Sequence, residues 1–108
     1  KITVIDGDAL TVDISSWHNS IRMMFYDGPH DYNSVSAMTE YYYNALASEA
    51  ILIFDDANWR GVVDGARNGL KKVNAHVTYE KLLLNSEENK NEWWNGLYIV
   101  VIRKHDVN

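Results

Sequence analysis

Two short apolar runs that each end in acidic residues constrain the fold of this chain most. The first, Ile21–Tyr26, ends at Asp27, and the second, Ala50–Phe54, ends at Asp55 and Asp56. Nearly continuous apolar runs of this length are typical of strands that are buried on both faces of a parallel sheet. Ligands of open α/β sheets bind beyond the carboxyl ends of the strands. The two acidic ends therefore predict a functional site at one edge of an α/β sheet.

Helical periodicity predicts one helix after each of these strands. A first apolar stripe predicts a helix over Asn33–Ser48, and a second predicts a helix over Trp59–Val73. Their apolar positions are Val35, Met38, Tyr42, Ala45 and Leu46 in the first, and Val62, Ala66, Leu70 and Val73 in the second. Because a helix between consecutive strands makes them parallel with a right-handed crossover, the strands before and after Asn33–Ser48 should run parallel.

A second stripe on the later helix consists of Gly61, Gly65 and Gly69, at four-residue spacing. Each glycine inside a helix costs about 1 kcal/mol relative to alanine. Three of them on one line indicate that another backbone approaches closely, and close packing on the sheet is the simplest explanation.

The two ends of the chain predict further strands. The pattern predicts a short strand at Ile2–Ile5, followed either by a hairpin that turns at Asp6-Gly7 into Ala9–Ile14 or by a helix. At the other end, His76–Leu84 and Gly96–Arg103 predict an antiparallel pair joined by a polar loop over Asn85–Asn95. The predicted fold class is α/β, with a mostly parallel sheet, an antiparallel C-terminal strand pair and two flanking helices.

The bulk properties indicate a single domain over residues 1–108. The net charge of −5 argues against a nucleic-acid partner, and no apolar run approaches the roughly 20 residues of a membrane span. The absence of cysteine excludes disulfides and thiolate metal sites, and it fits a cytoplasmic location. The chain starts without Met, in a strand-like segment, so we expect it to be a piece of something longer.

Three carboxylates should meet if the strands that end at Asp27 and Asp55 are neighbours, since paired strands lie about 4.8 Å apart. With Asp56 beside them, either one carboxyl keeps its proton or a cation neutralises the group. Oxygen ligands suit Mg²⁺, Ca²⁺ or Mn²⁺. The alternative is that Asp55 caps the next helix and Asp27 caps its own turn, without a metal.

Two further side chains belong to the same region. His30 lies three residues after Asp27 and could accept a proton from a substrate hydroxyl, since the ordinary pKa of histidine is about 6.5. A structural hydrogen bond is the alternative for this histidine. Trp59 could form the wall of a substrate pocket, or it could serve core packing or a subunit contact.

These residues carry a family resemblance. Asp-Gly-x-His-x-Tyr at Asp27–Tyr32, followed by Ile-Phe-Asp-Asp at Ile53–Asp56, Trp59 and Gly61, resembles class I S-adenosylmethionine-dependent methyltransferases of the O-methyltransferase-like, family 24 type. In the metal-dependent members, an acid after the fourth strand and an acid pair (Asp-Asn) after the fifth hold a divalent ion. That ion binds the hydroxyl oxygens of the substrate and lowers their pKa.

The resemblance implies roles for individual residues. Asp27, Asp55 and Asp56 would bind the metal, although Asp56 stands where the metal-dependent type has Asn. Asp27 and His30 would be the catalytic residues, with His30 as the base at a position where that type has Lys. The stretch Gly7-Asp8-Ala9 resembles the one that approaches the adenine of S-adenosylmethionine. Trp59 would contact the substrate.

The family's first strand, its glycine-rich loop and the acid that holds the ribose are absent from this sequence. The resemblance therefore implies a partial Rossmann-like sheet that corresponds to the C-terminal half of a methyltransferase domain. The strand at Ile21–Tyr26 would then keep an exposed edge. We expect that the Ile2–Ile14 segment covers this edge, or that two chains pair there as a homo-oligomer.

The predicted function is that of a methyltransferase fragment, inactive by itself. Its parent would transfer a methyl group from S-adenosylmethionine to a hydroxyl of a small molecule or sugar, with possible metal assistance. Two alternatives remain open at this point. One is a non-catalytic interaction module that associates through the exposed sheet edge, and the other is a metal-dependent hydrolase that uses the same carboxylates.

Overall fold

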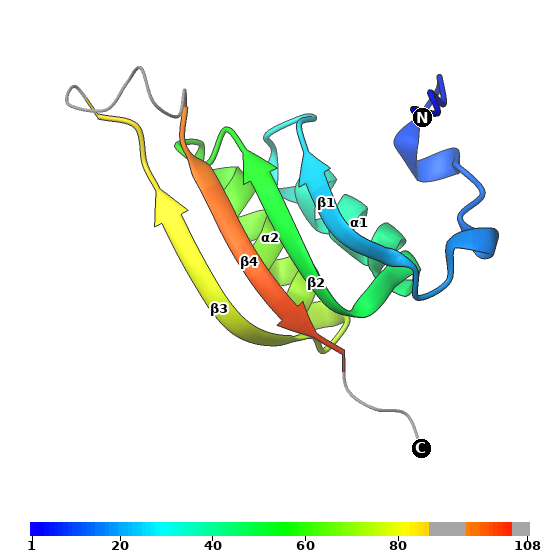
Figure 1. The fold of residues 1–108 in the computed structure, drawn as a ribbon. Coiled ribbons are helices and arrows are strands. Elements are labelled where there is room, and N and C mark those ends of the chain that lie inside the picture. Colours follow the sequence, from blue (N-terminus) through cyan, green and yellow to red (C-terminus); the bar gives the residue numbers. More distant parts are fainter. Residues whose placement is uncertain (87–94, 105–108) are drawn as a thin grey trace.

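The structure, a computed structural model, describes residues 1–86 and 95–104. Four strands form one sheet: β1 (Ile21–Tyr26), β2 (Leu46–Asp55), β3 (His76–Leu83) and β4 (Leu97–Arg103). Two helices, α1 (Tyr32–Tyr42) and α2 (Arg60–Lys72), cover one face of this sheet (Figure 1). Short 3₁₀ turns lie at Ala9–Thr11, Ser15–Trp17 and Tyr43–Ala45. None of the helices in the described ranges has the length and apolar character needed to cross a membrane.

The strand order is β1-β2-β4-β3. β1 pairs with β2 in parallel, whereas β4 pairs antiparallel with both β2 and β3. The α/β class, the two flanking helices and the antiparallel C-terminal pair are confirmed, but the prediction of a mostly parallel sheet is wrong. The reason is the path of the chain after α2, because β3 goes to the edge and β4 returns into the position beside β2. Most of the loop predicted over Asn85–Asn95 lies outside the described residues.

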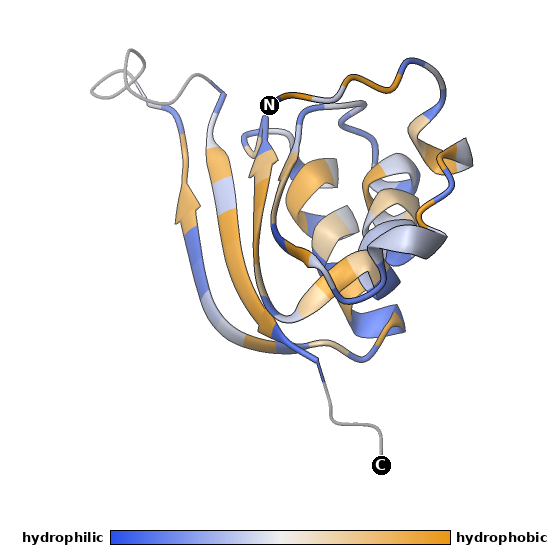
Figure 2. Cartoon of the chain, turned by 45° about the vertical axis from the view of Figure 1, so that its right-hand side comes forward, coloured by the Kyte–Doolittle hydropathy of each residue, from blue (hydrophilic) through white to orange (hydrophobic). Residues whose placement is uncertain are grey.

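The helix-covered face of the sheet forms the core. Alternate residues of β2 and β4 point into it and are fully buried, including Leu52, Phe54, Tyr98 and Val100. The same strands present their other residues to a face on which no described element packs (Figure 2). The structure therefore has two layers, and one face of the sheet is open.

The first helix is shorter than its apolar pattern predicts. α1 ends at Tyr42, and β2 begins at Leu46, which is paired with Ile21 of β1. Ala45 and Leu46 continue the helical spacing, but both are buried in the turn and strand that follow. Ser48 and Glu49 are exposed and polar, so the apolar pattern of the sequence does not reveal that β2 begins before Ala50.

The N-terminal segment differs from prediction. Residues 1–8 form neither helix nor strand, and the expected hairpin is replaced by 3₁₀ turns. Ile2 is 89% exposed, since no strand pairs with it in the described structure. The Tyr41 hydroxyl donates to the Val12 carbonyl and the Tyr42 hydroxyl to the Ala9 carbonyl, both at 2.5 Å. The segment thus lies against the end of α1 and does not cover the edge of β1 (Figure 1).

The glycine stripe of α2 faces α1. A Cβ atom on Gly65 would lie 2.6 Å from the Tyr32 carbonyl oxygen, and one on Gly69 would lie 2.7 Å from the Thr39 Cβ. The close backbone approach is therefore confirmed, but its predicted partner, the sheet, is wrong. The glycines let the two helices touch each other while both rest on the sheet.

Three polar side chains, Arg67, Glu80 and Tyr98, link α2 to β3 and β4 by hydrogen bonds. The Tyr98 hydroxyl donates to Glu80 Oε1 at 2.6 Å, and Arg67 Nη2 donates to the same oxygen at 3.0 Å. Burial, followed by the hydrogen bond to Glu80, raises the pKa of Tyr98 to about 12. The hydrogen bonds from Tyr98 and Arg67 lower the pKa of Glu80. These contacts join α2, β3 and β4, and so hold the edge strand in place.

We expect Gly65→Ala to lower the free energy of unfolding by about 1–3 kcal/mol. Alanine favours a helix by about 1 kcal/mol over glycine, but its Cβ would press on the α1 backbone. Urea unfolding measures the difference, with the exposed Lys71→Ala in the same helix as the control. A Gly65→Ala protein as stable as the wild type would contradict the close helix packing.

Candidate functional site

The parallel pairing of β1 and β2 brings the acidic residues together. Tyr26 is paired with Phe54, so Asp27 and Asp55 leave the sheet side by side. One carboxylate oxygen from each of Asp27, Asp55 and Asp56 can be chosen so that the three lie within 4.8 Å of one another. The predicted convergence of the three acids is confirmed.

The acids influence one another electrostatically. Burial raises the pKa of Asp55, and the charges of Asp56 and Asp27 raise it further, against a backbone hydrogen bond from Asp56 that lowers it. Asp27 is exposed, whereas Asp55 and Asp56 are half-buried. The group therefore holds concentrated negative charge at a position that a ligand can reach from solvent.

Helix capping does not explain these acids. Asp31 is the N-cap of α1, where its carboxylate accepts a hydrogen bond from the Ser34 N–H at 3.0 Å. The N-cap of α2 is Trp59, which makes no side-chain capping bond. Asp55 therefore does not cap the following helix, as the alternative interpretation of the sequence supposed.

The backbone after β2 is held by the segment that precedes β4. Asp56 has a left-handed backbone, with φ of 60°. The Ala57 N–H donates to the Gly96 carbonyl at 3.2 Å, and the Asn58 N–H donates to the Asn95 carbonyl at 2.7 Å. Asn95 Nδ2 also donates to Asp56 Oδ1 at 3.4 Å. Asn95 was not among the predicted site residues, although the Asn95-Gly96 pair is a common sequence signal for a turn with positive φ.

His30 lies beside the acids and stacks on the ring of Trp59. Its imidazole stacks on the Trp59 indole with centroids 4.8 Å apart and ring planes 11° apart. His30 Nε2 lies 3.8 Å from Asp56 Oδ2. A Cβ on Gly61 would lie 2.8 Å from the His30 carbonyl oxygen, so this glycine lets α2 start directly beside the histidine loop. Trp59 is 55% exposed, and its contact with a substrate stays a prediction.

Gly7, Asp8 and Ala9 are not brought to the acid group. The Asp8 carboxylate accepts from the Leu10 N–H at 2.9 Å and caps the first 3₁₀ turn, while the Ala9 carbonyl is held by Tyr42. Their contacts are thus local or with the last turn of α1. Their role toward adenine stays a prediction.

The comparison with protein families identifies the class. Residues 1–57 match a family model described as a methyltransferase domain. The match covers β1, α1, β2 and all three acids, together with His30. This chain belongs to that methyltransferase family, and its domain is of the class I S-adenosylmethionine-dependent type. Neither the search of curated proteins nor that of solved structures gave a match.

We expect Asp55→Asn to stabilise the protein at about pH 7 by up to about 1 kcal/mol. The folded-state pKa of Asp55 lies above its ordinary value of 3.8, so the ionised form disfavours folding at neutral pH. As the pH falls through the raised pKa, the wild-type carboxyl takes up a proton and the difference between the proteins shrinks.

Thermal unfolding at about pH 7 and about pH 3 measures this dependence. Asp6→Asn, which removes the same charge from an exposed position, is the control. A stabilisation that is equal for both variants, or that does not change with pH, would mean that the acids do not repel one another.

Proposed function

We propose that this chain provides the acceptor side of a methyltransferase site, at which a hydroxyl of a small molecule or sugar receives the methyl group of S-adenosylmethionine. The observation that carries the proposal is the meeting of three carboxylates and a stacked histidine at the carboxyl ends of two parallel strands. Family membership supports S-adenosylmethionine as the methyl donor.

The acid group fits a hard divalent cation. Two oxygens bound to one Ca²⁺ at about 2.3–2.6 Å cannot lie more than roughly 5 Å apart, and the limit for Mg²⁺, at about 2.0–2.1 Å, is roughly 4 Å. One carboxylate oxygen each from Asp27, Asp55 and Asp56 lies within 4.8 Å of the others, which meets the limit for Ca²⁺, whereas Mg²⁺ or Mn²⁺ would require the three carboxylates to move slightly closer together. A bound cation would lower the pKa of a coordinated substrate hydroxyl and would relieve the repulsion that raises the pKa of Asp55.

The proton balance assigns a role to His30. In the reaction, the acceptor oxygen forms a bond to the methyl carbon while the bond from that carbon to sulfur breaks, and the sulfonium becomes a thioether. The hydroxyl proton passes to His30 Nε2, and Asp56, 3.8 Å away, stabilises the imidazolium. Trp59 limits the movement of the imidazole by stacking on it.

We place the cofactor-binding half outside these residues. The sequence contains no glycine-rich phosphate or nucleotide loop. Ile2 and Val4 are almost fully exposed, and the outer edge of β1 is unpaired in the described structure. A glycine-rich half that lay in space beside β1 would pair with that edge. It would also lie next to Gly7–Ala9, so that these residues and the acids would border one cofactor site.

The test is transfer of a labelled methyl group by the natural protein that carries both halves, with catechols and sugars as acceptors. We expect His30→Ala to lower kcat/KM by about 10²–10⁴-fold. His76→Ala, a histidine on the far edge strand, is the control. We also expect removal of divalent ions by a chelator to lower the rate, and Asp55→Asn to abolish that metal dependence.

Calorimetry on the 108-residue chain with S-adenosylmethionine supplies the second arm, and we expect little heat. Tight binding by this chain alone would contradict the half-site. Absence of methyl transfer by the complete protein would contradict the function, and metal-dependent ester hydrolysis in its place would support the hydrolase alternative.

The open face of the sheet favours a second candidate function, self-association. Met23 and Phe25 of β1 are 61% and 55% exposed and lie beside an edge that no described strand pairs. An edge without proline or lysine is prone to pairing. We propose that two copies join their β1 strands antiparallel about a two-fold axis, so that each strand satisfies the other's backbone groups.

Light scattering tests this association, with a dimer expected for the wild type at micromolar concentration. We expect Met23→Lys with Phe25→Lys to weaken dimerisation at least about ten-fold, because it places charges along the joined edge. Tyr79→Lys is the control, since Tyr79 is similarly exposed on the opposite edge strand. A wild-type monomer at all concentrations, or an equal loss in both variants, would contradict the proposal.

A further inference from the structure

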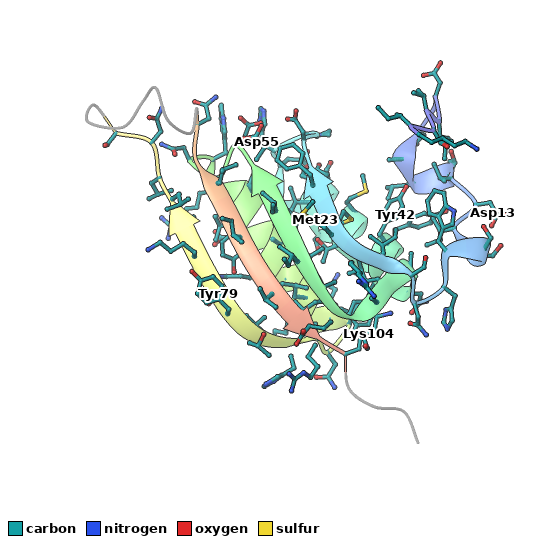
Figure 3. All side chains as sticks on the ribbon, in the orientation of Figure 1. Asp13, Met23, Tyr42, Asp55, Tyr79 and Lys104 are labelled. Atoms are coloured by element: carbon teal, nitrogen blue, oxygen red, sulfur yellow. The ribbon has the colours of Figure 1, made fainter. Side chains whose placement is uncertain are left out.

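A wide hollow lies at the end of the sheet opposite to the acids, where β1 and β2 begin and β4 ends. Its volume is about 1340 Å³. Polar and basic side chains from four separate segments line it, among them His18, Asn19, Arg22, Asn44, Asn74 and Lys104. We call it the basal hollow. Figure 3 shows Lys104 and Asp55 at opposite ends of the sheet.

The charge of the basal hollow is opposite to that of the chain. The whole chain has a net charge of −5, yet this hollow contains Arg22 and Lys104. Its lining also contains Glu49, but Arg103 Nη2 lies 3.2 Å from Glu49 Oε2 and balances it. Within residues 1–86 and 95–104, neither Arg22 nor Lys104 forms an ion pair with a carboxylate. Two cations therefore lack a counter-charge in the described structure.

The ammonium group of Lys104 is held by neutral partners. Lys104 Nζ donates to Asn19 Oδ1 at 2.8 Å and to the Asn44 carbonyl at 3.5 Å, and it lies 5.0 Å from the centre of the Tyr43 ring. Partial burial lowers the pKa of Lys104. An ammonium has three N–H donors, so these contacts leave one for a ligand. A cation removed from water without an anion is unfavourable, and an anionic ligand would compensate for it.

The frame of the hollow is fixed by backbone hydrogen bonds. The Asn19 N–H donates to the Asn44 carbonyl at 3.0 Å, the Ser20 N–H donates to the Ala45 carbonyl at 2.9 Å, and the Lys104 N–H donates to the Ser48 carbonyl at 2.8 Å. The polar groups are thus positioned before any ligand arrives, which reduces the ordering that binding requires.

We propose that the basal hollow binds a small phosphate monoester through Arg22 and Lys104. Guanidinium and ammonium groups are the side chains that recognise phosphate most often, the first as a fork and the second as a point charge. The hollow is lined by these two cations and by the side-chain amides of Asn19, Asn44 and Asn74, all of which can donate hydrogen bonds. A carboxylate has only two oxygens to accept them, whereas a phosphate monoester has three terminal oxygens. The volume leaves room for the organic part of the ligand. This site does not depend on the proposed methyl transfer.

The experiment is a titration of the full chain with a sugar phosphate and with inorganic phosphate at constant ionic strength, followed by calorimetry and by backbone amide shifts. We expect saturable binding of the sugar phosphate, with shifts at Asn19, Asn44 and Lys104. Lys104→Gln and Arg22→Gln should each weaken it about ten-fold or more. Lys81→Gln, which removes a charge from an exposed position on β3, is the control.

Several outcomes would overturn the proposal. Absence of saturable binding, or an equal loss in Lys81→Gln, would mean that only diffuse charge is involved. Acetate that binds as tightly as the sugar phosphate would show that the hollow does not select phosphate over carboxylate. Equal affinity for inorganic phosphate would show that the organic part of the monoester makes no contact. Shifts at Asp27 and Asp55 alone would place the ligand at the other end. Arg22→Gln changes an exposed side chain, so it tests the site even if Lys104→Gln unfolds.

Discussion

The parallel pairing of β1 with β2 is the constraint on which the rest of the structure depends. Tyr26 faces Phe54 across this pair, and both side chains are buried under the helices. A slip of one residue in β2 would turn Leu52 and Phe54 out of the core and onto the open face. The burial of apolar side chains therefore fixes the register, and the register in turn sets Asp27 beside Asp55. The position of the acids is a consequence of core packing.

A second constraint, independent of the sheet, positions the histidine. α1 and α2 approach so closely that Gly61, Gly65 and Gly69 have no room for a Cβ. The loop that carries His30 leads into α1, and Gly61 at the start of α2 touches its backbone. Trp59, at the N-cap of α2, then meets the imidazole. The sheet thus positions the acids and the helix pair positions His30, so the geometry of the site depends on both kinds of packing.

The sequence predicts the parts of this structure that depend on local pattern. β1, α2 and the acidic ends follow from apolar runs and helical spacing, and the convergence of the acids follows from the helical crossover. The sequence pattern gave wrong element boundaries where contacts between distant residues determine the secondary structure. Ala45 and Leu46 keep the helical spacing of α1 but are buried by a turn and a strand, and Ile2 has a strand-like neighbourhood without a partner strand.

The insertion of β4 beside β2 could not be predicted for a related reason. The sequence indicates that β3 and β4 pair, but it contains no signal for which of them also pairs with β2. The observed order leaves the fully buried residues Val100 and Ile102 beside Ala50 and Leu52, while the more polar β3, with Glu80 and Lys81, takes the edge. The most apolar strand takes the central position because both of its neighbours then help to bury it.

The antiparallel direction of β4 explains how one strand serves both ends of the sheet. Asn95 and Gly96, which precede it, lie at the carboxyl end of β2, where their carbonyls accept hydrogen bonds from the Asn58 and Ala57 N–H groups. Lys104, which follows the strand, lies at the opposite end of the sheet and contributes a positive charge to the basal hollow. A parallel strand in this place would have sent Lys104 toward the acids, where it would have neutralised Asp55 and Asp56. The mixed sheet therefore keeps Lys104 and the acidic residues at opposite ends of the sheet.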